Sequence, residues 1–417
     1  MTQLRNVNIK TQDSFAIDAF GRLRVSNPAT LFDSKNIFDD NGLGSAFENQ
    51  PLFFDNQNIS GSGTSTQYRV NESSQRLTVS SAAGARVRQS KQRFNYQSGK
   101  SQLCMVTFNL ISLDANIRKR VGYFDDNNGL FLETSSSDVY LVRRTSTSGS
   151  PVDSQVAQAS WNIDPFDGTG PSGITLDLTK TQILLTDFEW LGVGRVRMGF
   201  VIDGIIYYAH EFLSANNLTV VYMKSPNLPI RYEIENLGGG STSSLDSICS
   251  TVISEGGTQD RGVDRYASTT TLVDANAAGT VYAVVGLKLK TEYIGATIKI
   301  LQTNLLEVQG SKNLEWLLIL NPDVAGTFTY SNVINSAVQV AYGATANEVT
   351  NGTIVDGGFF ISSQGKTGGA SETEITNQLS IGSTIDGTPD EIILCVKPLA
   401  GSTNTDVYGA IKWRELV

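Results

Sequence analysis

Short runs of alternating apolar and polar residues, separated by residues that favour turns, recur along most of this chain. The clearest pair covers residues 195–202 and 205–212, which are joined by Asp203-Gly204. Alternation places every second side chain on one face of a strand, and an Asp-Gly pair between two such runs is a strong β-hairpin signal. Residues 125–128 predict a second hairpin between apolar runs. We therefore expect antiparallel β-structure.

Composition supports the same fold class. Charged residues make up 18 % of the chain, and there are 39 glycines. Soluble domains usually carry about 25 % charged residues. Here Gly, Ser, Thr, Asn and Gln take their place, and these residues suit strands and turns better than helices. The predicted fold is all-β: an antiparallel β-sandwich, a second C-terminal β-sandwich domain and an extended N-terminal arm.

The expected boundaries divide the chain into three parts. Residues 1–50 form the arm, 51–258 the first sandwich and 259–417 the second domain. The glycine run at 238–240 reads as a loop inside the first sandwich, because strand-like residues follow it. Two further strands are expected at 218–224 and 230–235.

The arm contains one compact block, Phe20-Gly21-Arg22-Leu23-Arg24-Val25-Ser26. Leu23 and Val25 alternate with arginines, which predicts a single strand with no local partner. Because a lone strand is unstable, we expect it to dock on another sheet or another subunit. The residues predicted to anchor the chain are Phe20, Arg22, Leu23, Arg24 and Val25. Residues 31–38 are expected to form one short helical turn.

Charge and hydropathy restrict the partners. The net charge is −9, which argues against nucleic acid as the main partner, since phosphate binding needs cationic surface. No apolar run approaches the roughly 18 residues that a membrane span requires, so no membrane insertion is expected. The first residues lack the apolar segment of a secretion signal, which predicts assembly in a cytoplasm.

Few residues are available for cofactor or metal chemistry. His210 is the one histidine of the sequence, so a multi-histidine metal site is excluded. Cys104, Cys249 and Cys395 are far apart and form no C-x-x-C pair, and each lies in an apolar run, which predicts buried thiols. Residues 125–128 resemble a calcium loop in composition but lack its full spacing. We expect no cofactor.

The sequence offers only weak candidates for catalytic residues. Asp187 with Glu189, and Glu233 with Glu235, each place two acids on one strand face. Paired carboxylates are what a glycosidase needs. However, alternating acids are usually the solvated face of a strand, and His210 is expected to pack among strand aromatics. We therefore expect a protein without enzymatic activity.

A local basic stripe suggests an interface. No acidic residue lies between Glu72 and Asp114, whereas that stretch contains Arg86, Arg88, Lys91 and Arg93. In an acidic protein such a stripe can dock on an acidic neighbour, including a second copy of the chain. The alternative is an exposed edge strand that its charges protect against aggregation.

Several segments together resemble one family of proteins. The chain resembles virion structural proteins of tailed phages, those of marine and cyanobacterial phages especially. The segments that carry the resemblance are the block at 20–26 with Leu31-Phe32-Asp33-Ser34, the stretch from Trp190 to Phe212, and Pro229-Ile230-Arg231-Tyr232-Glu233-Ile234. The likeness covers roughly residues 15 to 260. It implies a concanavalin-like β-sandwich and no catalytic residues.

The expected function follows from this resemblance and from the composition. It is that of a virion structural protein on the particle exterior, such as a fibre, spike or decoration protein, anchored by its arm. Its expected partners are other virion proteins, further copies of itself and a host surface glycan. One alternative is a lectin-like adhesion protein with a groove near Trp190, Tyr207 and Tyr208. Another is a polysaccharide depolymerase using Glu189 and Glu233.

Overall fold

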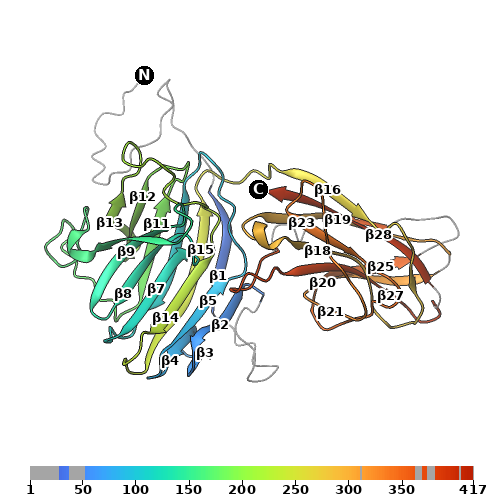
Figure 1. The fold of residues 1–417 in the computed structure, drawn as a ribbon, viewed down its shortest axis with the longest axis horizontal. Coiled ribbons are helices and arrows are strands. Elements are labelled where there is room, and N and C mark those ends of the chain that lie inside the picture. The colour runs from blue at the N-terminus through green and yellow to red at the C-terminus, as the bar shows by residue number, and fades with distance from the viewer. Residues whose placement is uncertain are drawn as a thin grey trace, which may run out of the picture.

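The computed structural model describes residues 28–36, 52–309, 312–361, 369–372, 381–402 and 405–416. Over these residues the chain forms two β-rich bodies that lie side by side (Figure 1). Strand pairs are antiparallel in both bodies. The all-β, antiparallel fold class predicted from the sequence is confirmed.

The first domain consists of two facing sheets. Across the first sheet the strands are, in order, β13 (Ile205–Phe212), β12 (Val196–Ile202), β11 (Gln182–Phe188), β6 (Gln102–Asn109), β15 (Ser243–Ser254), β4 (Ser74–Val79) and β3 (Thr64–Arg69), with β1 (Ala29–Lys35) also paired to β15. Across the second sheet they are β10 (Val152–Ala157), β9 (Asp138–Thr145), β8 (Gly129–Ser135), β7 (Ile117–Phe124), β14 (Ile230–Asn236), β5 (Gly84–Ser90) and β2 (Phe54–Gly61). The apolar faces of the two sheets enclose one core.

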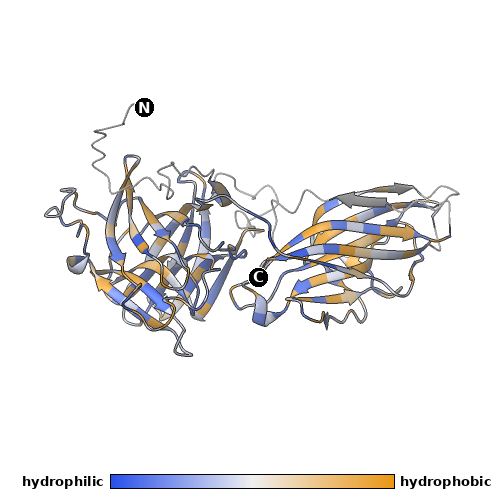
Figure 2. Ribbon diagram, turned by 90° about the horizontal axis from the view of Figure 1, so that it is seen from above, coloured by the Kyte–Doolittle hydropathy of each residue, from blue (hydrophilic) through white to orange (hydrophobic). Residues whose placement is uncertain are grey.

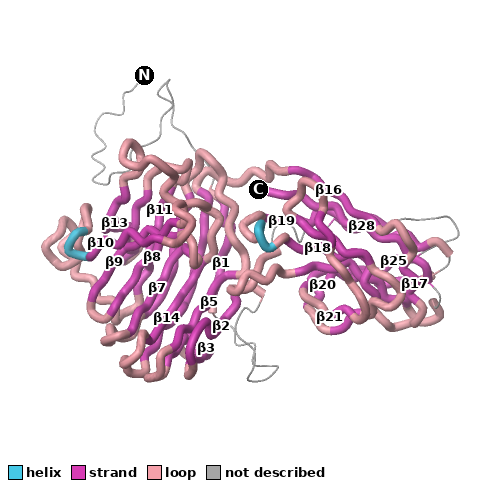
Figure 3. The backbone as a smooth tube through the Cα atoms, viewed as in Figure 1, coloured by secondary structure: helices cyan, strands magenta, loops and turns pink. Residues whose placement is uncertain are grey.

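The second domain also consists of two facing sheets, each with fewer strands. One sheet holds β16 (Val263–Ser268), β28 (Thr405–Leu416), β19 (Thr297–Glu307) and β26 (Gly369–Glu372), with β17 (Val273–Ala275) also on β28. The facing sheet holds β22 (Ser331–Asn332), β23 (Val338–Tyr342), β18 (Tyr282–Leu289), β27 (Glu391–Pro398), β20 (Asn313–Leu320) and β25 (Thr353–Ile361). β21 (Asp323–Val324) pairs with β24 (Val349–Thr350). The two described helical turns are η2 (Gln158–Ser160) and η3 (Thr291–Tyr293), shown in cyan in Figure 3.

Alternating sequence patterns account for most of these strands. Figure 2 shows apolar and hydrophilic residues alternating along many of them. The Asp203-Gly204 turn joins β12 to β13, and both residues adopt the positive φ (51° and 80°) that a tight hairpin turn requires. In the second domain, Trp413 on β28 is fully buried and donates its indole N–H to Glu415 at 2.9 Å.

The segment after the N-terminal block is a strand, so the predicted helical turn is wrong. β1 pairs with β15 from Ala29 opposite Ser254 to Lys35 opposite Cys249. Phe32 is 5 % exposed and belongs to the core of the first domain. Residues 28–36 are therefore built into the first sandwich, although the sequence assigned them to the arm.

The strand predicted at 218–224 is absent from the described structure, where these residues form a loop. The backbone groups of this segment form hydrogen bonds with other parts of the first domain instead of with a neighbouring strand. The backbone N–H of Tyr222 donates to the Gly192 carbonyl at 2.8 Å, and the Trp190 indole donates to the Met223 carbonyl at 3.0 Å. Tertiary contacts thus override the local β-propensity of this stretch.

The two domains are joined by more than the chain that links them. The linker after β15 is held on one side by Gln97, whose amide donates to the Gln259 carbonyl at 2.6 Å, and on the other by Lys299, 2.7 Å from Asp260. Beyond the linker, the Ser383 N–H donates to the Lys91 carbonyl at 3.0 Å.

A second group of contacts covers the edge of the first domain. The N–H of Ile385 donates to the Asp55 carboxylate on the edge strand β2 at 2.8 Å. Asn227 donates to the Gly295 carbonyl at 2.9 Å. We call this set of contacts between the two domains the seam. It holds the two domains against each other.

Candidate functional site

The basic residues predicted as a docking stripe have partners within the chain. Arg88 is fully buried, and its guanidinium carbon lies 4.1 Å from the centre of the Phe54 ring. Lys91 lies 3.5 Å from Asp390 in the second domain. The remaining two, Arg86 and Arg93, reach Thr66 at 2.7 Å and Asp125 at 2.5 Å. These side chains therefore stabilise the two domains and the seam rather than forming one exposed cationic surface.

The residues predicted to anchor the chain lie outside the described residues. They are Phe20, Arg22, Leu23, Arg24 and Val25. What the structure places is the strand directly after them, β1.

One predicted acid pair lies in an arginine–carboxylate network on the second sheet. Glu233 is buried and contacts Arg231 at 2.8 Å and Arg120 at 2.9 Å, while Arg120 also contacts Glu133 at 2.5 Å. Burial alone would raise the pKa of Glu233, but Arg231 and Arg120 outweigh it and hold that pKa below its usual value. A glycosidase acid needs a raised pKa. Arg231 and Arg120 instead favour the ionised form of Glu233.

The other predicted residues of the first sheet are also engaged. Asp187 is buried against Arg197, and the Tyr208 hydroxyl donates to its carboxylate at 3.1 Å. Trp190 and Tyr207 pack partly buried against the core. These aromatic rings contribute to the packing of the first domain.

His210 packs among aromatics, as the sequence predicted. Its ring meets Phe212 edge-on at 4.6 Å between centroids, and its Nδ1 accepts the Asn162 N–H at 3.2 Å. Burial lowers the pKa of His210. The ring therefore serves as a neutral acceptor for a loop.

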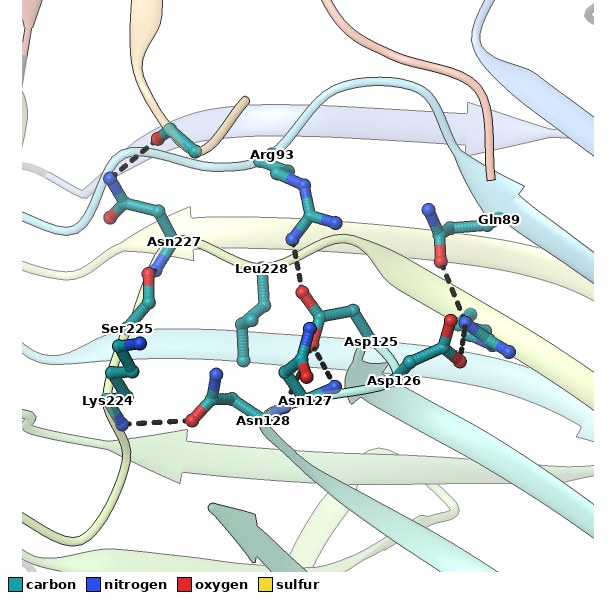
Figure 4. A network of polar contacts seen from close by, with 12 residues as sticks. Gln89, Arg93, Asp125, Asp126, Asn127, Asn128, Lys224, Ser225, Asn227 and Leu228 are labelled. Atoms are coloured by element: carbon teal, nitrogen blue, oxygen red, sulfur yellow. Dashed lines mark hydrogen bonds and ion pairs between the residues drawn. The ribbon is translucent and has the colours of Figure 1, made fainter. Parts of the chain in front are cut away.

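A cavity of about 560 Å³ lies at the seam, and we call it the seam pocket. Three segments line most of it: the β7–β8 turn at 125–128, the loop at 224–227, and η3 with the residues that follow it, 291–296. The first two belong to the first domain and the third to the second domain. The pocket thus exists only because the domains are docked. Figure 4 shows the side of it that the first domain contributes.

The β7–β8 turn is rigid because Asp125 closes it. Its Oδ1 accepts the N–H groups of Asn127 and Asn128, both at 2.8 Å. Its Oδ2 accepts from Arg93. This pattern explains the Asp-rich turn as a closed hairpin. Among the described residues, no three His, Cys, Asp or Glu side chains gather as a metal site needs.

Two further amides position the neighbouring loop. The Asn128 side-chain oxygen accepts the Lys224 N–H at 2.9 Å (Figure 4). Asn227 bridges the domains, since its oxygen accepts the Tyr96 N–H at 2.9 Å while its amide donates to Gly295. The loop that lines the pocket is therefore held by the Asn128 side chain and, through the side chain of Asn227, by the backbones of Tyr96 and Gly295.

Other side chains at the pocket remain accessible. Tyr293 is 49 % exposed, and Asn127, Lys224 and Glu292 are exposed as well. For the Asn127 amide and the Lys224 ammonium, the described part of the chain offers no hydrogen-bond partner. The pocket is thus lined both by side chains that hydrogen bonds hold in place and by exposed side chains, two of which have no hydrogen-bond partner among the described residues.

Sequence reasoning found only fragments of this site. It identified residues 125–128 as a hairpin turn and Arg93 as part of the basic stripe, but it assigned residues 218–224 to a strand. It drew no inference from residues 291–296. A local sequence pattern cannot indicate that three segments from two domains line one pocket.

A smaller cavity of about 240 Å³ lies elsewhere between the domains. It is lined by the start of β1 at Thr30 and Leu31, by linker residues Thr258 and Asp260, and by Lys299 of β19, among others.

No helix in the described residues is long and apolar enough to cross a membrane.

Comparison with known proteins gives a likeness of fold only. No protein-family model matches the chain, and no curated protein matches its sequence. Similar solved structures include arcelin-5, a lectin-like defence protein from Phaseolus vulgaris, with 8 % identity and a TM-score of 0.31 over 54 % of this chain and 98 % of that one. A β-1,3-glucanase from Mycobacterium marinum gives 12 % identity and a TM-score of 0.34 over 54 % of this chain and 98 % of that one.

A third such structure is the carbohydrate recognition domain of Emp47p, with 10 % identity and a TM-score of 0.30 over 49 % of this chain and 89 % of that one. At these values the likenesses say nothing about what this chain binds or catalyses.

Proposed function

We propose that this chain is a non-enzymatic structural component on the exterior of a phage particle, held there by its N-terminal segment and contributing to host attachment. The sequence resemblance over residues 15 to 260 supports this role. Its partners are then other virion proteins and further copies of the chain at symmetric positions, assembled in the host cytoplasm.

The observation that carries the proposal is the position of β1. Asn27 and Pro28 alone separate the block at 20–26 from this strand. β1 is fixed by the register on β15, by Phe32 in the core, and by Asn36, whose amide donates to the Ser247 and Ile248 carbonyls at 2.9 Å. The residues that follow the block are therefore fixed in a sheet, which suits an anchoring role for the segment before them.

The state of the acidic groups supports a role without catalysis. The buried carboxylates of Glu233 and Asp187 are both held by arginines. The arginines beside Glu233 hold its pKa below its usual value, so this carboxyl is not a poised proton donor.

Removal of residues 1–27 tests the anchoring role. The truncated chain keeps β1, so we expect it to fold with the same thermal midpoint as the full chain and to be absent from purified particles in a complementation assay. A matched control removes residues 1–12 and keeps the block at 20–26, and it is expected to be incorporated. Incorporation of the 1–27 truncation at the normal level would contradict the anchoring role.

A second candidate function, lectin-like carbohydrate binding, is favoured by one feature of the structure. The seam pocket gathers amide, hydroxyl and charged groups in a cavity of the size that small ligands occupy. This function is compatible with the first, because an attachment protein needs a group to recognise on its host.

A further inference from the structure

We propose that the seam pocket binds a neutral carbohydrate and that both domains hold it. This deepens the attachment role proposed above and rests on it for its biological purpose, but its test is independent. The pocket differs from the groove near Trp190 that the sequence suggested, because it lies where the second domain meets the β7–β8 turn.

The size of the cavity sets the scale of the ligand. Its volume of about 560 Å³ falls within the range of roughly 300–1,000 Å³ that is usual for small-molecule sites. A short oligosaccharide fits such a space.

The charges around the cavity favour a neutral ligand. The charged residues that line it are two cations, Arg93 and Lys224, and two carboxylates, Asp125 and Glu292. Their formal charges cancel. Arg93 is moreover neutralised by its contact with Asp125. A phosphate, sulfate or nucleotide site would need an excess of positive charge, which this cavity does not have.

The hydrogen-bonding groups match hydroxyls. Three amides, those of Asn127, Asn128 and Asn227, and the hydroxyls of Ser146 and Ser225 line the pocket. Amides and hydroxyls both donate and accept, and so do the hydroxyl groups of a sugar. Asn128 and Asn227 already have partners within the protein, so the Asn127 amide is the one of the three that is left free for a ligand hydroxyl.

An aromatic ring supplies the apolar contact that a sugar face needs. Tyr293 lines the pocket with about half of its surface exposed, and the Lys290 ammonium lies 5.7 Å from its ring centre. The C–H groups of a pyranose ring form an apolar face that stacks on an aromatic ring. Tyrosine adds contact area at low entropic cost because it has few rotatable bonds.

The fixed groups make the site preorganised. Asp125 and Asn128 are held by the turn and by the loop backbone, and Asn227 is held across the seam. Such groups lose little freedom when a ligand binds, so more of the contact energy appears as affinity. The free groups, Asn127, Lys224 and Tyr293, are left to adapt to the ligand.

The test uses the full chain and a defined set of probes. Purified protein is screened on an array of neutral oligosaccharides built from glucose, galactose, mannose and N-acetylglucosamine, with sialylated and sulfated versions of the same chains. We expect a neutral oligosaccharide to bind. Titration calorimetry then compares the full chain with Asn127→Ala and Tyr293→Ala, and each substitution is expected to weaken binding at least about tenfold.

Tyr266→Ala is the matched control, because Tyr266 is an exposed tyrosine on the edge strand β16 and is not among the pocket residues. It is expected to leave affinity unchanged. Any one of three results overturns the proposal. No neutral oligosaccharide binds, the anionic versions bind in preference, or both pocket variants keep the affinity of the wild-type chain. Thermal unfolding of each variant separates loss of binding from loss of fold.

Failure of this proposal is distinguishable from failure of the anchoring role. Particle incorporation depends on residues 1–27 and is measured without any glycan. A chain that is incorporated but binds no neutral oligosaccharide keeps the structural role and loses the seam-pocket assignment. A chain that binds but is not incorporated gives the reverse result.

Discussion

Lys119 carries an ammonium group that the first domain encloses almost completely. Its side chain is 1 % exposed, and Nζ donates to the Leu110 carbonyl at 2.6 Å and the Ser112 carbonyl at 2.8 Å. Asp114 lies 3.9 Å away. Burial lowers the pKa of Lys119 to about 8, although Asp114 pulls it upward. The cost of enclosing a cation is therefore only partly offset by its acceptors.

This lysine makes stability depend on pH in a defined window. An unfolded lysine titrates near pH 10.4, so between about pH 8 and 10 the unfolded chain holds more protons than the folded chain. The contribution of Lys119 to the free energy of unfolding therefore rises with pH through that window, by up to about 3 kcal/mol. We expect the difference between the wild-type chain and a Lys119→Met variant to rise in the same way, as measured by urea unfolding from pH 7 to 10.

The comparison with the variant matters because buried thiols act in the opposite sense. Burial raises the pKa of Cys104, so above about pH 8.5 the unfolded chain loses a proton that the folded chain keeps. That effect lowers stability as pH rises, but it is the same in both proteins and cancels in the difference. A difference that stays flat from pH 7 to 10 would show that Lys119 titrates normally.

Among the elements, β1 has the most direct consequence for stability. Phe32 meets the rings of Phe53, Phe54 and Phe94 at centroid distances of 6.2, 5.8 and 4.9 Å. Truncating such a buried ring to alanine removes apolar burial and leaves a cavity, which typically costs 3–5 kcal/mol.

We therefore expect Phe32→Ala to lower the free energy of unfolding of the first domain by about 3 kcal/mol, measured by chemical denaturation. Truncation of residues 1–27 is the control and is expected to change it by less than about 0.5 kcal/mol. Equal effects of the two changes would mean that β1 is not an integral strand.

Local patterns revealed the hairpins but not β1. Asp203-Gly204 signals its turn by itself, because two adjacent residues can adopt positive φ there and the strands on either side alternate. β1 pairs with a strand more than 200 residues away, as the contact between Ser34 and Ser250 shows. Nothing in seven residues indicates a partner at that distance, and the local sequence by itself favours a short helical turn.

At the scale of the whole molecule, the seam keeps the domains in one arrangement. Asp55 and Lys91 contribute to it and lie outside the seam pocket. We expect the double variant Asp55→Ala, Lys91→Ala to increase the exchange rate of the Ser383 amide at least about tenfold, as measured by hydrogen exchange, because its acceptor, the backbone carbonyl of residue 91, is kept in the variant.

Core amides of both sandwiches serve as the internal reference and are expected to keep their rates. If the domains are held elsewhere, the Ser383 amide exchanges as in the wild-type chain. The same variant is expected to weaken carbohydrate binding, because ligand affinity and domain docking are then coupled free energies.

The seam also explains how far sequence reading can go for this site. The turn at 125–128 is recognisable because Asp and Asn favour such turns. Its neighbours at 224–227 and 291–296 join it only after both domains have folded and docked. The sequence therefore predicts the fold class and several elements, whereas the pocket depends on contacts between distant segments.

The register of β1 determines how the molecule responds to force. Ala29 lies opposite Ser254, so the N-terminal segment and the linker to the second domain leave the first sandwich at the same end of two neighbouring antiparallel strands. Tension between an anchored N-terminus and a tethered second domain would pull these strand ends apart, breaking the cross-strand hydrogen bonds one after another rather than loading them together in shear. Most of the first sandwich lies outside that load path. Under such tension β1 is the mechanical weak point, and its peeling leaves the remaining strands unstretched.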